Sequence, residues 1–165
     1  MRDRKPDVSV RSIRAEDVPH VRALHARSFA ELARDHHTPE QIEAHAQLVL
    51  ADSYQDELLS NNLLVAEAEG HIVGTAGWCA VADAPGTARI RKVFVAPEVA
   101  GRGLGRLLVG EAEKQALESG YARFVVRANA NAVGFYVRLG YRTIRSGRMP
   151  AADGVELPVT FMEKA

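Results

Sequence analysis

Three glycines at alternate positions, Gly101, Gly103 and Gly105, separate a strand-like run from an amphipathic helical run in the segment VFVAPEVAGRGLGRLLVGEAE. Glycine has no Cβ, so this loop can adopt positive φ angles and can approach a ligand closely. The helix that follows has free amide groups in its first turn, at the positive end of its dipole. The segment therefore predicts a strand, a loop and a helix in which the loop binds an anion such as phosphate. A tight turn without a ligand would use the same glycines.

Two common phosphate-binding loops do not fit this spacing. A dinucleotide-binding loop has a third glycine at its sixth position, where this chain has Arg106 when counted from Gly101 and Leu108 when counted from Gly103. A nucleoside triphosphate loop needs a Gly-Lys dipeptide, which the sequence lacks. The loop therefore belongs to a third class.

The length and composition of the chain narrow the class of protein. Its 165 residues, 47% of them hydrophobic, suit one domain over 1–165. The 21 acidic and 21 basic residues balance, which argues against nucleic acid or a membrane surface as a partner. No run approaches the ~20 apolar residues of a membrane span, the start MRDRKPDVSV has no apolar signal region, and the single Cys79 suits a reducing compartment. We therefore expect a cytoplasmic protein.

Hydrophobic periodicity predicts alternating strands and helices. A helix is expected from position 18, where apolar residues follow a helical spacing, and Thr38, Pro39 and Gln41 form the capping signature of a second helix. Further helices are expected at 104–119 and 131–139, and strands at 8–13, 63–67, 72–78, 87–97, 121–128, 141–144 and 157–163. This order, with two helices before the main sheet, predicts an α/β (α+β) protein whose sheet has mixed strand directions.

The segments AGRGLG and NANAVGFYVRLGY carry a resemblance to a known family. The first matches the pattern Arg/Gln-x-x-Gly-x-Gly/Ala except at its first position, where Ala100 stands. The second matches Asn-x-x-Ala-x-x-Phe/Leu-Tyr-x-x-x-Gly-Phe/Tyr in full, at Asn129, Ala132, Phe135, Tyr136, Gly140 and Tyr141. Together they resemble the GNAT superfamily of acetyl-CoA-dependent N-acetyltransferases. The resemblance implies a mixed, largely antiparallel central sheet with helices on both faces.

The resemblance also implies that acetyl-CoA is the acyl donor. Backbone amides of 101–106 would bind its pyrophosphate, and main-chain groups of Phe94 and Val95 would pair with its pantetheine arm as another strand would. The implied cofactor-binding residues are Val93, Phe94, Val95, Gly101, Arg102, Gly103, Leu104, Gly105, Arg106 and Asn129. Ala100 lacks the side chain that lies near the phosphates in many members, and Arg102 or Arg106 would compensate. Asn129 is equally placed to cap the helix that follows it.

The implied reaction is attack by a primary amine on the acetyl thioester. Tyr136 matches the catalytic acid of the family, with an ordinary buried helix tyrosine as the alternative. A backbone amide near Val93, where the corresponding strand bulges, is the implied oxyanion donor. Because a phenol has a pKa of about 10 and a thiol one of about 8.5, a hydrogen bond to the departing thiolate is as plausible as full proton transfer.

The spacing of residues does not single out a general base. Many members of the superfamily place a glutamate on the strand before the phosphate loop, where this chain has Arg89, Arg91 and Lys92. Water or one of the side chains of Glu31, His36, His37 and Asp83 would have to serve. The three cations disfavour a polycationic acceptor and favour one with a carboxylate or phosphate, unless they form a solvated sheet face.

The acceptor itself is not fixed by the sequence. A small-molecule amine is expected, because neither charge nor length provides an obvious groove for a macromolecule, and a protein or peptide amine is the alternative. Candidates to line the acceptor pocket are Phe29, His36, His37, Tyr54, Trp78, Arg91 and Met149. Trp78 would otherwise be a core residue, and His36 and His37 a solvated pair. The spacing of the six histidines predicts no metal site.

Two non-catalytic functions remain as alternatives. One is a module that senses acetyl-CoA through the same loop, and the other is an adaptor whose N-terminal helices bind a protein. By analogy with the family, the apolar run LPVTFME is also a candidate to pair two copies in a homodimer.

Overall fold

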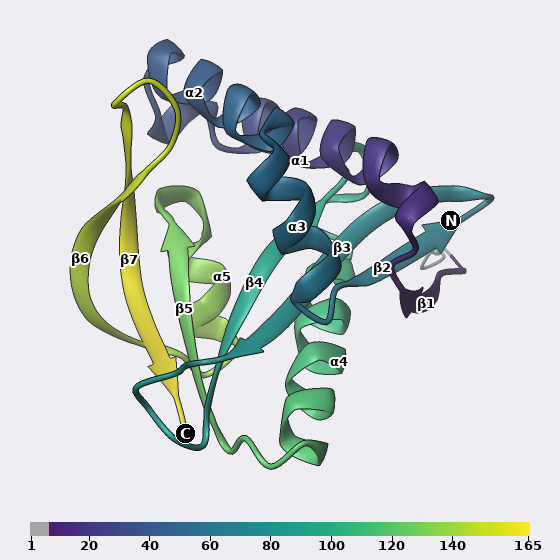
Figure 1. Ribbon diagram of the computed structural model, residues 1–165, viewed down its shortest axis with the longest axis vertical. Helices are drawn as coiled ribbons and strands as arrows, with labels where there is room; N and C mark the ends of the chain where they lie inside the picture. Colours follow the sequence, from purple (N-terminus) through teal and green to yellow (C-terminus); the bar gives the residue numbers. More distant parts are fainter. Residues whose placement is uncertain (1–6) are drawn as a thin grey trace.

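The computed structural model describes residues 7–165 and contains one seven-stranded sheet in the order β1-β2-β3-β4-β5-β7-β6 (Figure 1). The strands are β1 (Ser9–Ser12), β2 (Leu64–Ala68), β3 (His71–Ala80), β4 (Thr87–Val95), β5 (Arg123–Asn129), β6 (Arg142–Pro150) and β7 (Glu156–Lys164). Among these strands of the described residues, β4 and β5 pair in parallel and all other neighbours are antiparallel. The predicted mixed, largely antiparallel sheet is therefore confirmed. Residues 1–6, within the start that showed no apolar signal region, lie outside the described residues.

Helices cover both faces of the sheet (Figure 1). They are α1 (Val18–Leu32), α2 (Pro39–Leu50), α3 (Asp52–Ser60), α4 (Leu104–Glu118) and α5 (Val133–Arg138). Successive residues of β2 face the helices on opposite sides of the sheet. Leu64 packs in the core cluster that contains Leu108 of α4, whereas Val65 packs with Tyr54 and Leu58 of α3. No helix within residues 7–165 is long and apolar enough to cross a bilayer.

The structure has one helix more than the sequence predicted before the main sheet. Helix α3 has the polar sequence DSYQDELLS, and its buried side chains are only Tyr54 and Leu58. One i, i+4 pair is too short a stripe to predict a helix by periodicity. The helix forms because those two side chains pack against β2, which the sequence alone does not reveal.

Strand β7 contains the run LPVTFME, which was a candidate to pair two copies of the chain. It lies inside the sheet of one chain. It pairs with β5 on one side and with β6 on the other. Both of its hydrogen-bonding edges are therefore occupied within the chain. Strand β6, which extends beyond the expected 141–144, forms one edge of the sheet, and β1 forms the other.

Strands β4 and β5 diverge, and this divergence creates the site. They pair only from Thr87 to Ile90 and from Arg123 to Val126. Beyond these residues β4 stays with β3 and β5 stays with β7. A gap therefore opens in the middle of the sheet at the carboxyl ends of its two parallel strands.

Candidate active site

Two cavities meet in the gap between β4 and β5. One has a volume of about 340 Å³ and reaches the glycine loop, and the other has a volume of about 460 Å³ and reaches α3, β6 and β7. The residues that line both are Val93, Phe94, Asn129, Ala132 and Tyr136. Two ligands that enter from opposite sides would therefore meet beside these five residues.

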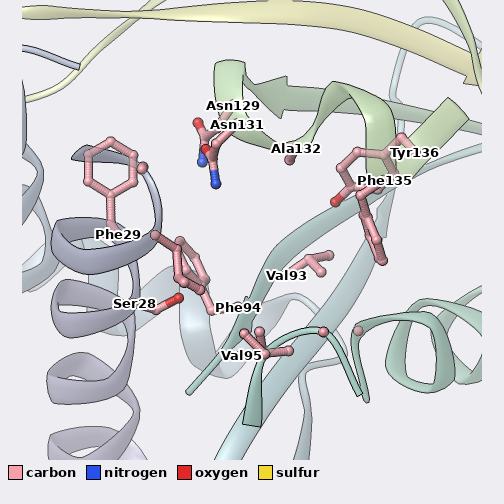
Figure 2. Close-up of a pocket in the computed structure, with 15 residues that line it drawn as sticks. Ser28, Phe29, Val93, Phe94, Val95, Asn129, Asn131, Ala132, Phe135 and Tyr136 are labelled. Atoms are coloured by element: carbon pink, nitrogen blue, oxygen red, sulfur yellow. The ribbon is translucent and has the colours of Figure 1, made fainter. Parts of the chain in front are cut away.

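The smaller cavity, called the donor cavity below, is built from the unpaired edge of β4 and the glycine loop. Its lining includes Val93, Phe94 and Val95 of β4, together with Gly101 and Gly105 (Figure 2). The main chain of β4 has no strand partner on this side, since β5 has turned away. An extended ligand can therefore add to β4 through main-chain hydrogen bonds.

The glycine loop has the conformation that its sequence predicted. Gly101 and Gly103 have φ angles of 77° and 84°, and Gly103 immediately precedes α4. Gly105 packs against Phe135, where an added Cβ would lie only 3.2 Å from the ring. Of the other predicted loop residues, Arg102 and Arg106 are exposed and Leu104 is buried in the core. The first turn of α4 thus presents its free amides beside the donor cavity.

A β-bulge in β4 lies where the two cavities meet. The pairing of β3 with β4 shifts between Thr75 and Gly77, and Lys92 has a φ angle of 56°. The hydroxyl of Thr75 donates a hydrogen bond of 2.7 Å to the carbonyl of Lys92. This bond directs that carbonyl toward β3 and leaves the next amide, that of Val93, in the strand edge beside the donor cavity.

A buried hydrogen-bond relay holds the bulge in place. Because the Thr75 proton is used on the Lys92 carbonyl, His25 must donate from Nε2 to Thr75 Oγ1, at 2.7 Å. Its Nδ1 then accepts from the hydroxyl of Tyr54 at 2.5 Å. Burial, followed by repulsion from Lys92, lowers the pKa of His25 well below its usual value. The imidazole is therefore neutral, as this relay requires.

Tyr136 directs its hydroxyl into the space where the cavities meet (Figure 2). No side chain or main-chain group among residues 7–165 forms a hydrogen bond with that hydroxyl, so it is free to donate to a ligand. Burial and the nearby carboxylate of Glu113 raise the pKa of Tyr136 above its usual value. Hydrogen-bond donation is thereby favoured over full loss of the proton.

Asn129 lies at the end of β5 and lines both cavities. It occupies the position before the short 3-10 helix Ala130–Ala132, but its side chain makes no capping hydrogen bond there. Figure 2 shows the amides of Asn129 and Asn131 near one another at the donor cavity. Of the two roles that the sequence left open, contact with a ligand is the one this geometry favours.

The larger cavity, called the acceptor cavity below, is rich in positive charge. Four cations line it, Arg89, Arg91, Lys92 and Arg127, with Glu57 as the carboxylate among its lining residues. Glu57 lies 2.7 Å from the Lys92 ammonium and 3.4 Å from the Arg91 guanidinium. These cations outweigh the effect of burial and lower the pKa of Glu57, so it is ionised. The pKa of Lys92 is lowered by burial, which outweighs the opposite effect of the Glu57 carboxylate.

Of the other residues predicted for the acceptor, some line these cavities and some do not. Phe29 lines the donor cavity, while Tyr54, Arg91 and Met149 line the acceptor cavity. The remaining candidates, for the acceptor pocket or for the general base, line neither cavity: Glu31, His36, His37, Trp78 and Asp83. Trp78 is buried in the core near Tyr121, and His37 is buried with its Nδ1 on the carbonyl of Ala33. These last two positions are structural.

Several residues of the site were not predicted from the sequence: His25, His45, Glu57, Thr75 and Arg127. His45 lines the acceptor cavity, stacks on Phe29 at 4.0 Å between ring centroids and has its pKa lowered to about 4 by burial. Both His25 and His45 lie on the apolar faces of predicted helices, which is the one sequence feature that indicates burial. Nothing local connects Glu57 or Thr75 with Lys92.

Comparisons with known proteins report which family and fold the chain resembles. A family model described as an acetyltransferase (GNAT) domain matches residues 33–164. A Bacillus subtilis strain 168 protein, provisionally named as an alanine N-acetyltransferase of ribosomal protein bS18, is 29% identical over 143 residues, or 82% of each chain.

Two solved structures share the fold. A GCN5-related N-acetyltransferase from Rhodopseudomonas palustris has a TM-score of 0.85 and 27% identity, over 100% of this chain and 98% of that one. The PaiA N-acetyltransferase of Thermoplasma acidophilum, solved with coenzyme A, has a TM-score of 0.78 and 20% identity, over 96% of this chain and 98% of that one. The likeness therefore extends over the whole sheet and its helices.

Proposed function

The chain belongs to the GNAT acetyltransferase family, whose N-acetyltransferases use acetyl-CoA as acyl donor, and from this premise we propose that it acetylates the primary amine of a small molecule bound in the acceptor cavity. The observation that supports this assignment is the meeting of two cavities beside Val93 and Tyr136. The acceptor cavity, of about 460 Å³, is of a size typical for small ligands.

In this proposal the donor cavity holds acetyl-CoA. The amides at Gly101 to Arg106 bind the pyrophosphate, where the dipole of α4 adds a favourable field. The pantetheine arm pairs with the free edge of β4 at Phe94 and Val95, and the thioester lies beside Asn129. Ala100 brings no side chain to the phosphates, so the main chain carries this contact and exposed Arg102 and Arg106 add positive charge nearby.

The reaction joins the amine nitrogen to the acetyl carbonyl carbon and breaks the carbon–sulfur bond. The amide of Val93 at the bulge stabilises the oxyanion of the tetrahedral intermediate. The Tyr136 hydroxyl donates a hydrogen bond to the departing thiolate, because its raised pKa disfavours complete proton transfer. The products are the acetamide and coenzyme A, and the proton released by the amine balances the thiol.

The positive charge of the acceptor cavity helps the amine to become a nucleophile. A lysine-like ammonium with a pKa of about 10.4 is neutral only about once in a thousand molecules near pH 7.4, which costs about 4 kcal/mol. The four cations of the cavity disfavour a further positive charge and therefore lower the pKa of a bound ammonium. Deprotonation to water then becomes easier without a dedicated strong base.

A second candidate acceptor is the N-terminal amine of a protein. The name of the Bacillus subtilis relative, an alanine N-acetyltransferase of a ribosomal protein, supports it. An α-amine has a pKa near 8, so its deprotonation costs less than about 1 kcal/mol near neutral pH. Peptides that begin with alanine therefore belong in any acceptor panel.

The test is release of coenzyme A from acetyl-CoA, followed with a thiol reagent, over a panel of amines, amino acids and alanine peptides. We expect Tyr136→Phe to lower kcat by about 10- to 100-fold and to change the KM for acetyl-CoA by less than about 3-fold, since the hydroxyl acts on the leaving group. Tyr121→Phe is the matched control, because Tyr121 packs near Trp78 away from both cavities.

The outcomes separate the alternatives. Binding of acetyl-CoA without turnover of any acceptor would contradict the enzyme and favour a sensor of acetyl-CoA. Absence of acetyl-CoA binding would contradict both and favour an adaptor. An alanine peptide turned over faster than every small amine would replace the small-molecule acceptor with a protein one.

A further inference from the structure

Two of the four cations in the acceptor cavity have no carboxylate partner among the described residues. Arg91 and Lys92 share Glu57, and Arg91 also bonds to the side-chain oxygen of Asn61 at 3.4 Å. Arg89 and Arg127 form no ion pair within residues 7–165. Their charges face a cavity rather than a counter-ion.

The strand register brings these two arginines together. Arg89 pairs with Val125 across the parallel β4–β5 ladder, and Arg127 is the second residue beyond Val125 on β5. Side chains two apart on a strand share a face. Arg89 and Arg127 therefore project from the same face of adjacent strands, at the place where these strands begin to separate.

Both guanidinium groups have an unsatisfied buried atom. The Nε atoms of Arg89 and Arg127 are buried and have no hydrogen-bond partner among the described residues. Burial, followed by repulsion from Arg89 and Arg91, lowers the pKa of Arg127. An anion between the two side chains would accept hydrogen bonds from the guanidinium nitrogens that face the cavity and would offset this repulsion.

We propose that the acceptor carries a carboxylate or phosphate group, and that Arg89 and Arg127 bind it while its amine lies beside Val93 and Tyr136. This specificity rests on the acetyltransferase function proposed above. Arginine suits the task because its planar fork binds carboxylate and phosphate through two hydrogen bonds.

The strands also set the separation of amine and anion. At ~3.3 Å per residue, the Cα of Arg127 lies about 7 Å along β5 from Asn129. Arg89 lies four positions before Val93 on β4, on the other side of the bulge. In the proposed acceptor, a short chain of atoms therefore separates the amine from the anionic group. A linear six-carbon spacer is a suitable probe.

The experiment compares four amines with this spacer: 6-aminohexanoate, 6-aminohexanamide, 6-aminohexyl phosphate and 1,6-diaminohexane. We expect kcat/KM for one or both anionic amines to exceed that for the amide and the diamine by about 10-fold or more. The carboxylate and phosphate arms show which anion the site prefers. Turnover of both anionic amines no faster than that of the amide would overturn the inference while leaving the acetyltransferase function intact.

Arginine variants locate the effect. Arg127→Gln and Arg89→Gln should each lower kcat/KM for the preferred anion by about 10- to 100-fold. Turnover of the amide should fall by less than about 3-fold, because it loses only the effect of one cation on the pKa of its ammonium. Arg127→Lys should recover part of the loss, because it keeps the charge without the fork. The matched control is Arg123→Gln, because exposed Arg123 lies on the same strand outside the cavity. A loss of equal size for the amide would overturn the assignment.

A binding measurement separates this inference from the proposed function. Calorimetry with 6-acetamidohexanoate and 6-acetamidohexyl phosphate, which have no reactive amine, and the protein saturated with coenzyme A reports anion binding without turnover. We expect binding that is about 10-fold weaker or more in Arg127→Gln. If no amine is acetylated, the proposed function fails, and absence of binding of both capped anions overturns the anion site by itself. An amidated alanine tetrapeptide acetylated faster than both anionic amines would also overturn it.

Discussion

At the scale of single residues, the site depends on a backbone conformation of Lys92 that residues other than glycine rarely adopt. Lys92 adopts a φ angle of 56°, where a non-glycine residue is strained by the order of 1–3 kcal/mol. The relay through Thr75 and His25, the ion pair with Glu57 and the contact of its ammonium with the Tyr54 ring at 4.1 Å hold it there. The motif predicted Tyr136 and Asn129 by position, but the spacing around Lys92 gave no sign of the relay.

The first prediction concerns Thr75. Thr75→Val removes the hydroxyl at nearly constant shape, so the Lys92 carbonyl loses the bond that fixes the bulge. We expect kcat to fall by about 10- to 100-fold, with the KM for acetyl-CoA changed by less than about 3-fold, because the oxyanion donor is displaced while the glycine loop is untouched. The free energy of unfolding should also fall by about 1–3 kcal/mol, since buried groups lose partners.

Thr75→Ser is the control, since it keeps the hydroxyl. Its kcat should stay within about 3-fold of the parent protein. If the valine and serine variants lose stability and kcat equally, packing rather than the hydrogen bond fixes the bulge. Steady-state kinetics and thermal unfolding of both variants measure this.

At the scale of secondary-structure elements, local patterns predicted most helices and strands, and the errors lie where contacts between elements decide. Helix α3 was missed because its apolar stripe is one pair of side chains, yet it supplies Tyr54 and Glu57 to the acceptor cavity. Strand β7 is apolar because it lies between β5 and β6, so its composition indicates an internal strand of the sheet. The glycine loop, in contrast, was predicted because its turn is determined by neighbouring residues.

Gly103 of the loop and Gly110 of helix α4 form a matched pair for the next prediction. Gly103 has a φ angle of 84°, whereas Gly110 is an exposed position inside α4 with open space around an added Cβ. Gly103→Ala should strain the loop by about 1–2 kcal/mol and raise the Kd for acetyl-CoA by about 10-fold, because the amides move. Gly110→Ala should stabilise the protein by about 0.5–1 kcal/mol through helix propensity.

Calorimetry of acetyl-CoA binding and chemical denaturation distinguish the two variants. The Kd of Gly110→Ala should remain that of the parent protein. Equal acetyl-CoA affinity in both variants would show that the loop conformation does not support the pyrophosphate site.

At the scale of the whole molecule, helices on one face of the sheet supply the aromatic and histidine side chains that close the junction of the two cavities. His25 stacks on Phe94 at 4.1 Å between centroids, and His45 stacks on Phe29 at 4.0 Å. Both imidazoles are neutral because burial lowers their pKa values. The stability of the protein is thereby linked to pH.

The last prediction follows from the pKa of His45, which the fold lowers from 6.5 to about 4. As the pH falls, the unfolded chain binds a proton at this histidine before the folded protein does, so the free energy of unfolding decreases. This loss is absent well above pH 6.5 and grows as the pH falls toward 4. Between pH 6.5 and 5, His45 alone should account for about 2 kcal/mol of lost unfolding free energy, and His25 acts in the same direction.

Denaturant unfolding at several pH values measures this dependence. In His45→Phe, which keeps an aromatic ring beside Phe29, the loss of stability between pH 6.5 and 5 should be smaller by about that amount. His20→Phe is the control, because His20 is exposed on α1. An unchanged pH slope in His45→Phe would contradict the buried, neutral state of this histidine.

The sequence by itself determined the family, the mixed sheet, the glycine loop before its helix, and the motif that contains Asn129 and Tyr136. These features depend on turn conformation and helical periodicity, which neighbouring residues set. Only the tertiary structure decided the acceptor cavity, the relay and the two arginines that have no ion-pair partner within residues 7–165. His25 meets Tyr54 and Thr75 across 29 and 50 positions of the chain. Such contacts are fixed by the packing of helices on the sheet and by the divergence of β4 from β5, so no local pattern encodes them.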